Sequence, residues 1–156
     1  MVKPYINLVA VLFSIVFLFS GCSSDKKKLT EYLSSGKTYF EKQEYDNAKI
    51  QLLNAVNSDP NSLEARTLLA KTHVKLGNAE EAFTEYLRLE QMEPENIETL
   101  TKLATFFLVA KKYPEAERRI NEVLKIDKNN IEALYLQAGI HGSEIQEWKR
   151  IGAPLK

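Results

Sequence analysis

A 34-residue repetition organises most of this 156-residue chain. Small residues recur at this spacing in two series: Gly36, Ala70, Ala104 and Ala138, and Ala48, Ala82 and Ala116. A fixed period of this length indicates stacked supersecondary units, each of which buries its apolar face only against its neighbours. We therefore expect a linear array rather than a fold built around one central core.

Each repeat predicts two helices. From Leu63 to Val74, apolar residues recur three and four positions apart, as on one face of an amphipathic helix. Gly77 ends this pattern, and a second amphipathic stretch runs from Ala79 to Met92. The small residues allow the two helices of a pair to approach closely, so the sequence predicts an all-α fold of helix hairpins.

The pattern resembles the tetratricopeptide repeat, which has small residues at these two places and proline near its end. The resemblance implies an α-solenoid with repeats at 29–62, 63–96 and 97–130. A fourth unit starts at 131, but Arg150 stands where a small residue is expected. Residues 131–156 are therefore predicted to be a partial or degenerate repeat. Either a short helix from about Ser143 caps the open end of the array, or the 156 residues are the front part of a longer array.

The N-terminal segment has a different character. Residues 1–21 contain a single charge, and residues 5–19 form a mostly apolar run, shorter than the roughly 20 residues of a membrane-spanning helix. Ser20 and Gly21 precede Cys22, the one cysteine of the chain. This arrangement resembles a bacterial lipoprotein signal, which implies that residues 1–21 are removed and that Cys22 carries the lipid anchor. A transmembrane anchor and a plain secretory signal are the alternatives.

Residues 22–28 are expected to form a polar tether between the anchor and the first repeat. In extended form a tether of this length reaches ~20 Å. Its lysines at positions 26–28 either contact anionic lipid headgroups or form a solvated spacer.

Composition and motifs favour a binding function. The 21 Lys+Arg balance the 21 Asp+Glu, which argues against nucleic-acid binding by bulk charge. One cysteine and two histidines leave little for a metal site, and the chain has no phosphate-binding glycine loop or nucleophile motif. His73 and His141 share the repeat position of Tyr39 and Phe107, where we expect a packing role. We therefore predict no catalytic residue, metal, cofactor or small-molecule substrate.

The resemblance places a partner-binding groove on the first helices of the repeats, where an extended peptide or a partner helix can lie. The predicted groove residues are Lys37, Phe40, Lys71, Lys75, Lys102 and Tyr135. Lys37 and Lys71 stand at sites comparable to those with which chaperone-binding relatives clamp a C-terminal carboxylate. The asparagines of that clamp are missing, so we expect a different ligand.

Together these features predict a lipid-anchored scaffold or adaptor protein in the bacterial envelope, in the outer membrane and facing the periplasm. Similar lipoproteins serve in type IV pilus assembly, outer-membrane protein insertion and exosortase-linked polysaccharide export, and residues 51–66 look most like the last group. The alternative is a non-catalytic regulatory subunit of an envelope enzyme that acts on peptidoglycan.

Overall fold

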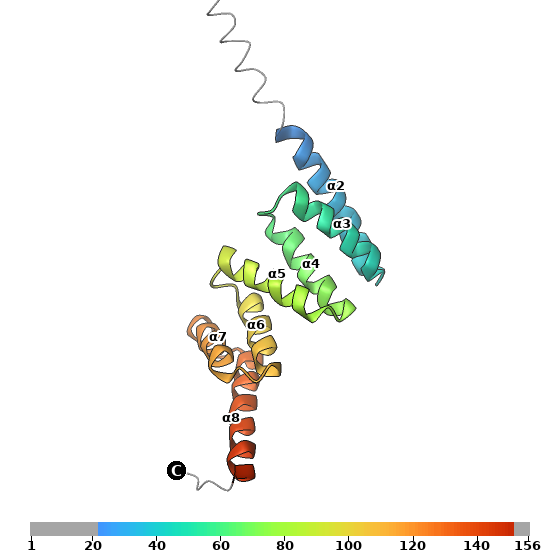
Figure 1. Cartoon of the computed structure of the whole chain (residues 1–156). Helices are drawn as coiled ribbons and strands as arrows, with labels where there is room; N and C mark the ends of the chain where they lie inside the picture. Colours follow the sequence, from blue (N-terminus) through green and yellow to red (C-terminus); the bar gives the residue numbers. More distant parts are fainter. Residues whose placement is uncertain (1–21, 152–156) are drawn as a thin grey trace, which may run out of the picture. The chain divides into compact units, whose positions relative to one another are not determined.

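The structure is a computed structural model that describes the backbone of residues 22–151 and the side chains of residues 26–142. These residues form seven helices and no strand (Figure 1). The helices are α2 (Cys22–Glu41), α3 (Tyr45–Ser58), α4 (Leu63–Leu76), α5 (Ala79–Met92), α6 (Ile97–Val109), α7 (Tyr113–Ile126) and α8 (Ile131–Ile151). None of these helices is both long and apolar enough to cross a membrane. The predicted signal segment, residues 1–21, lies outside the described residues.

The chain divides into two compact units at Gly77, in the middle of the second predicted repeat. The first unit contains α2, α3 and α4, and the second contains α5 to α8.

In the first unit, α3 packs against both α2 and α4. The core consists of small and medium-sized apolar side chains: Ala48, Leu52, Ala55, Val56, Ala65 and Leu69. Gly36 lies directly over this core, and a β-carbon added there would be 2.7 Å from Cδ2 of Leu52. The small residue predicted at position 36 is thus required by the close approach of α2 and α3.

In the second unit, α6 packs against α5, α7 and α8. Ala104 and Ala116, from the two small-residue series, are fully buried. Phe83 packs edge-to-face on Phe107, with ring centroids 5.3 Å apart. Tyr86 is also buried, and burial, with the nearby Glu98 carboxylate adding to it, raises its pKa to about 12.

Left-handed residues mark the turn inside each of the first three repeats. Gln43, Gly77 and Lys111 have φ of 61°, 74° and 57°, and they are 34 residues apart. The next position in this series is Ile145, whose β-branched side chain disfavours that conformation. Helix α8 accordingly runs through this position to Ile151 without a turn. The prediction of a separate short helix from about Ser143 was therefore wrong.

Two further expectations need correction. Residues 22–28 are the first part of α2 rather than an extended tether, which shortens their reach to about 10 Å. The shared position of the two histidines is a packing position at His73 and Phe107, which are buried, but His141 is exposed. The difference follows from α8, which continues straight where the other repeats turn back.

The close approach at Gly36 yields a testable prediction. We expect Gly36→Ala to lower the free energy of unfolding by about 1 kcal/mol, because a clash with buried Leu52 outweighs the gain in helix propensity. The matched control is Gly142→Ala in α8, where a β-carbon has no neighbour within 4 Å. This control should raise stability by about 0.5–1 kcal/mol. Urea unfolding followed by circular dichroism measures both, and equal stabilisation by the two variants would contradict the close approach.

Candidate functional site

The first unit contains a groove of about 510 Å³ between α2 and α4. The residues that line it are Lys37, Glu41, Leu63, Glu64, Thr67, Leu68 and Lys71. Helices α2 and α4 are the first helices of two successive repeats, so the groove lies on the face where the sequence predicted partner binding. The lining combines two leucines, one hydroxyl and four charged groups.

The charges in this groove cancel. Lys37 and Lys71 are balanced by Glu41 and Glu64, and Lys37 forms an ion pair with Glu64 whose side chains are 45% and 59% exposed. An ion pair this exposed contributes less than about 1 kcal/mol, so a ligand can open it at little cost. The groove can therefore offer apolar contacts and an exchangeable ion pair to an extended peptide.

A similar pair occurs in the second unit, where Lys102 Nζ lies 3.5 Å from Glu132 Oε1. Glu64 and Glu132 occupy the same place in their repeats, two periods apart. In each unit, a glutamate at the start of one repeat thus pairs with a lysine of the repeat before it. Two of the predicted groove lysines, Lys37 and Lys102, are thus paired with acidic side chains, a feature that the recurrence of Glu64, Glu98 and Glu132 in the sequence could have revealed.

The structure brings together some of the predicted groove residues and separates others. Lys37 and Lys71 line the same groove, whereas Lys75 is exposed on α4 outside that lining. Phe40 packs against the core of the first unit and lies edge-on to Tyr45, with ring centroids 5.4 Å apart. Phe40 is thus partly buried against the core and is not among the residues that line this groove. In the second unit, Tyr135 is 78% exposed on α8.

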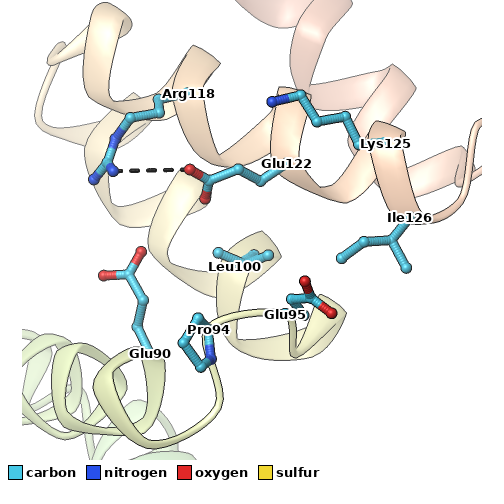
Figure 2. Close-up of a pocket in the computed structure, with 8 residues that line it drawn as sticks. All are labelled: Glu90, Pro94, Glu95, Leu100, Arg118, Glu122, Lys125 and Ile126. Atoms are coloured by element: carbon cyan, nitrogen blue, oxygen red, sulfur yellow. Dashed lines mark ion pairs between the residues drawn. The ribbon is translucent and has the colours of Figure 1, made fainter.

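A second hollow, of about 440 Å³, lies in the second unit. Figure 2 shows Pro94 and Glu95 on the segment between α5 and α6, with side chains of α7 across from them. On α7, Arg118 Nη1 lies 3.7 Å from Glu122 Oε1. With Glu90 and Lys125 also in its lining, this hollow carries both signs of charge and resembles the groove of the first unit in that respect.

Within the described part of the chain, no group of three or more His, Cys, Asp or Glu residues is placed to hold a metal ion.

Sequence reasoning missed a buried ion pair beside this hollow. Arg119 is 5% exposed and donates through Nε and Nη2 to the two carboxylate oxygens of Glu90, at 3.1 and 3.2 Å. Its guanidinium carbon also lies 4.6 Å from the centroid of the Phe107 ring. This one side chain therefore connects α5, α6 and α7.

Comparisons with known proteins agree with this architecture. Residues 32–62 and 63–96 each match the tetratricopeptide repeat. The first TPR domain of Spaghetti (RPAP3), solved with the HSP90 peptide SRMEEVD, has a TM-score of 0.68 and 19% identity, over 76% of this chain and 94% of that one. The second TPR domain of human RPAP3, solved with the HSP70 peptide SGPTIEEVD, has a TM-score of 0.65 and 16% identity, over 75% of this chain and 98% of that one.

A crystal structure of the MamA protein has a TM-score of 0.71 and 18% identity, over 76% of this chain and 65% of that one. At these identities the structural likeness shows the fold alone. Among curated protein sequences, none matches this chain significantly. The chain thus contains tetratricopeptide repeats at 32–96 within an all-helical fold, a type of fold that typically serves protein interaction rather than catalysis.

The two neighbouring arginines of α7 give a matched test of the buried pair. We expect Arg119→Ala to cost about 3–5 kcal/mol of unfolding free energy, because it leaves the Glu90 carboxylate without its partner. Arg118→Ala should cost less than about 1 kcal/mol, because the pair of Arg118 with Glu122 is exposed. Chemical unfolding of the two variants and the wild type measures the difference, and similar losses for both arginines would contradict the assigned role.

Proposed function

We propose that this protein is a non-catalytic adaptor that binds an extended segment of a partner protein in the groove between α2 and α4. The observation that carries the proposal is the groove itself, in which two leucines lie among polar groups able to exchange partners. Support comes from the two RPAP3 domains of the same fold, each solved with a peptide bound. Extended peptides suit such a groove because apolar side chains and main-chain groups can be recognised together.

The charge of the groove defines the class of peptide. The peptides in the two RPAP3 structures end in the acidic sequence EEVD, which calls for a basic site. Here Lys37 is paired with Glu64, and Glu41 offsets Lys71. We therefore propose a ligand of little net charge: an apolar side chain against Leu63 and Leu68, flanked by one acidic and one basic residue.

The proposed location follows from the N-terminal sequence. Removal of residues 1–21 and lipidation of Cys22 would anchor the chain in the cell envelope, in the outer membrane and facing the periplasm. Because α2 begins at Cys22, Lys37 would lie within about 23 Å of the anchor along the helix. The partner would then be a component of an envelope assembly or export machinery, such as that for pili, outer-membrane proteins or exopolysaccharide.

Site-specific photo-crosslinking tests the groove. We expect a benzoylphenylalanine at Thr67, which lines the groove, to capture a discrete protein partner in intact cells. The matched control is the same residue at Asn57, an exposed position on α3. Adducts detected by immunoblot should depend on position 67 and decrease at least several-fold when Lys71→Glu reverses the local charge. Equal adducts from both positions would reject the groove as the binding site.

The anchor has its own test. We expect the wild-type chain to incorporate radiolabelled fatty acid and to remain in the membrane fraction, and we expect Cys22→Ala to lose both properties. Ser23→Ala, one residue away, is the control and should retain both. Membrane retention of Cys22→Ala without label would instead identify the apolar segment as a transmembrane anchor.

A further inference from the structure

We propose that the first two turns of α2 bind the anionic headgroups of a lipid bilayer through Lys26, Lys27 and Lys28. This inference deepens the proposed location and rests on the proposed anchor at Cys22. Three observations carry it: α2 begins beyond the end of the helix that packs against it, the three lysines are exposed, and a helical backbone holds them close to the anchor.

The beginning of α2 projects beyond α3 in the first unit (Figure 1). A β-carbon at Gly36 would lie against Leu52, which defines the register of this antiparallel helix pair. Helix α3 ends at Ser58, six residues after Leu52. This end is therefore level with Thr30, which lies six residues before Gly36. Residues 22–29 thus extend past the end of α3, by about 12 Å.

The three lysines lie in this projecting part of α2. All of them are exposed, whereas Leu29, the next residue along the helix, packs against the core of the first unit. Successive positions of a helix differ by about 100° in direction, so the three side chains together span about 200° of its circumference. Lysines therefore face the bilayer for most of the directions in which α2 can tilt.

The helical backbone keeps these lysines at the level of the headgroups. Lys26 and Lys28 are about 6–9 Å from Cys22 along a helix, against about 14–21 Å along an extended chain. The attraction of a cation to an anionic membrane falls off within a Debye length, about 8 Å at physiological ionic strength. Because α2 begins at Cys22 and lysine side chains are long and flexible, all three ammonium groups can reach this range.

The charges near the anchor are complementary to an anionic surface. Among residues 22–29, Asp25 is the one acidic residue beside the three lysines. Glu31 follows at about 13 Å from Cys22 along the helix, beyond the range in which membrane charge acts strongly. An anionic bilayer at this end therefore experiences three attractions against one repulsion.

The position of the lysines within α2 also favours an anionic partner. Cations in the first turns of a helix oppose the helix dipole, whose N-terminal end is positive. A short helical end without tertiary contacts is, in addition, only marginally stable in water. Anionic headgroups at this end of α2 compensate for both effects, because they attract the lysines and the positive end of the dipole.

Partitioning of a chemically lipidated chain between water and vesicles tests the proposal. The chain without residues 1–21 is coupled through Cys22, the one cysteine of the sequence, to a maleimide that carries a single alkyl chain. One chain gives reversible binding, so an additional electrostatic contribution can be measured. We expect at least about tenfold tighter binding to mixed phosphatidylcholine–phosphatidylglycerol vesicles than to phosphatidylcholine vesicles at low salt, and no difference at high salt.

Two charge variants locate the effect on the chain. One variant should lose the preference for anionic vesicles and combines Lys26→Gln, Lys27→Gln and Lys28→Gln. The matched control removes three other exposed lysines and should keep the preference; it combines Lys42→Gln, Lys125→Gln and Lys128→Gln. Circular dichroism should show the same helix content in both variants and the wild type. Equal binding of the wild type to the two kinds of vesicle, or an equal loss in the two variants, would overturn the proposal.

This outcome can be distinguished from failure of the proposed anchor. Because the lipid is attached chemically, a chain that incorporates no fatty acid in cells would refute the lipidation of Cys22 without changing the vesicle result. Conversely, a coupled chain without preference for anionic vesicles would refute the lysine contacts and leave the lipidation of Cys22 intact.

Discussion

The close approach of paired helices is the constraint on which the rest of the structure depends. At Gly36 the approach leaves no room for a methyl group unless Leu52 moves, and Ala48 and Ala116 are fully buried on α3 and α7, which pack against α2 and α6. A repeat array has no central core, so its stability is a sum of such local interfaces. One enlarged side chain at these places affects a whole helix pair, which explains why small residues recur with the repeat.

The turn conformation determines where this pairing stops. A left-handed residue costs roughly 1–2 kcal/mol for any residue with a β-carbon, and Gln43 and Lys111 adopt that conformation nonetheless. The packing of the two helices that each turn joins compensates for that cost. At Ile145 the cost is higher and the small residue needed for packing is replaced by Arg150. Because of Ile145 and Arg150, α8 continues without a turn, and its apolar residues Ile131 and Leu134 are exposed.

Much of the fold could be predicted from the sequence because helix pairs depend on contacts that repeat with the chain. The period located the helices from α3 to α7, and five of the alanines in its two series are fully buried: Ala48, Ala70, Ala82, Ala104 and Ala116. Ala138, on α8, is exposed. Arg119 was missed because its partner, Glu90, is 29 residues away and breaks the period. The packing of Phe40 against the core was not predicted, because neighbouring positions on a helix differ by about 100° in direction and the repeat pattern does not determine the rotation of a helix closely enough. The straight course of α8 could not be predicted, because the sequence alone does not show that the turn residues at positions 43, 77 and 111 have positive φ.

In the binding mode that we propose, the ion pair of the groove contributes more to selectivity than to affinity. Lys37 and Glu64 come from successive repeats, so a ligand cation that replaces Lys37 contacts the second repeat, and a ligand anion that replaces Glu64 contacts the first. Because the pair is half exposed, opening it costs little, and a ligand group that takes its place gains little. A strongly acidic peptide would meet Glu41 and Glu64, and a strongly basic one would meet Lys37 and Lys71. In the binding mode that we propose, repulsion of like charges disfavours both kinds of peptide, and the apolar contacts at Leu63 and Leu68 supply most of the binding energy.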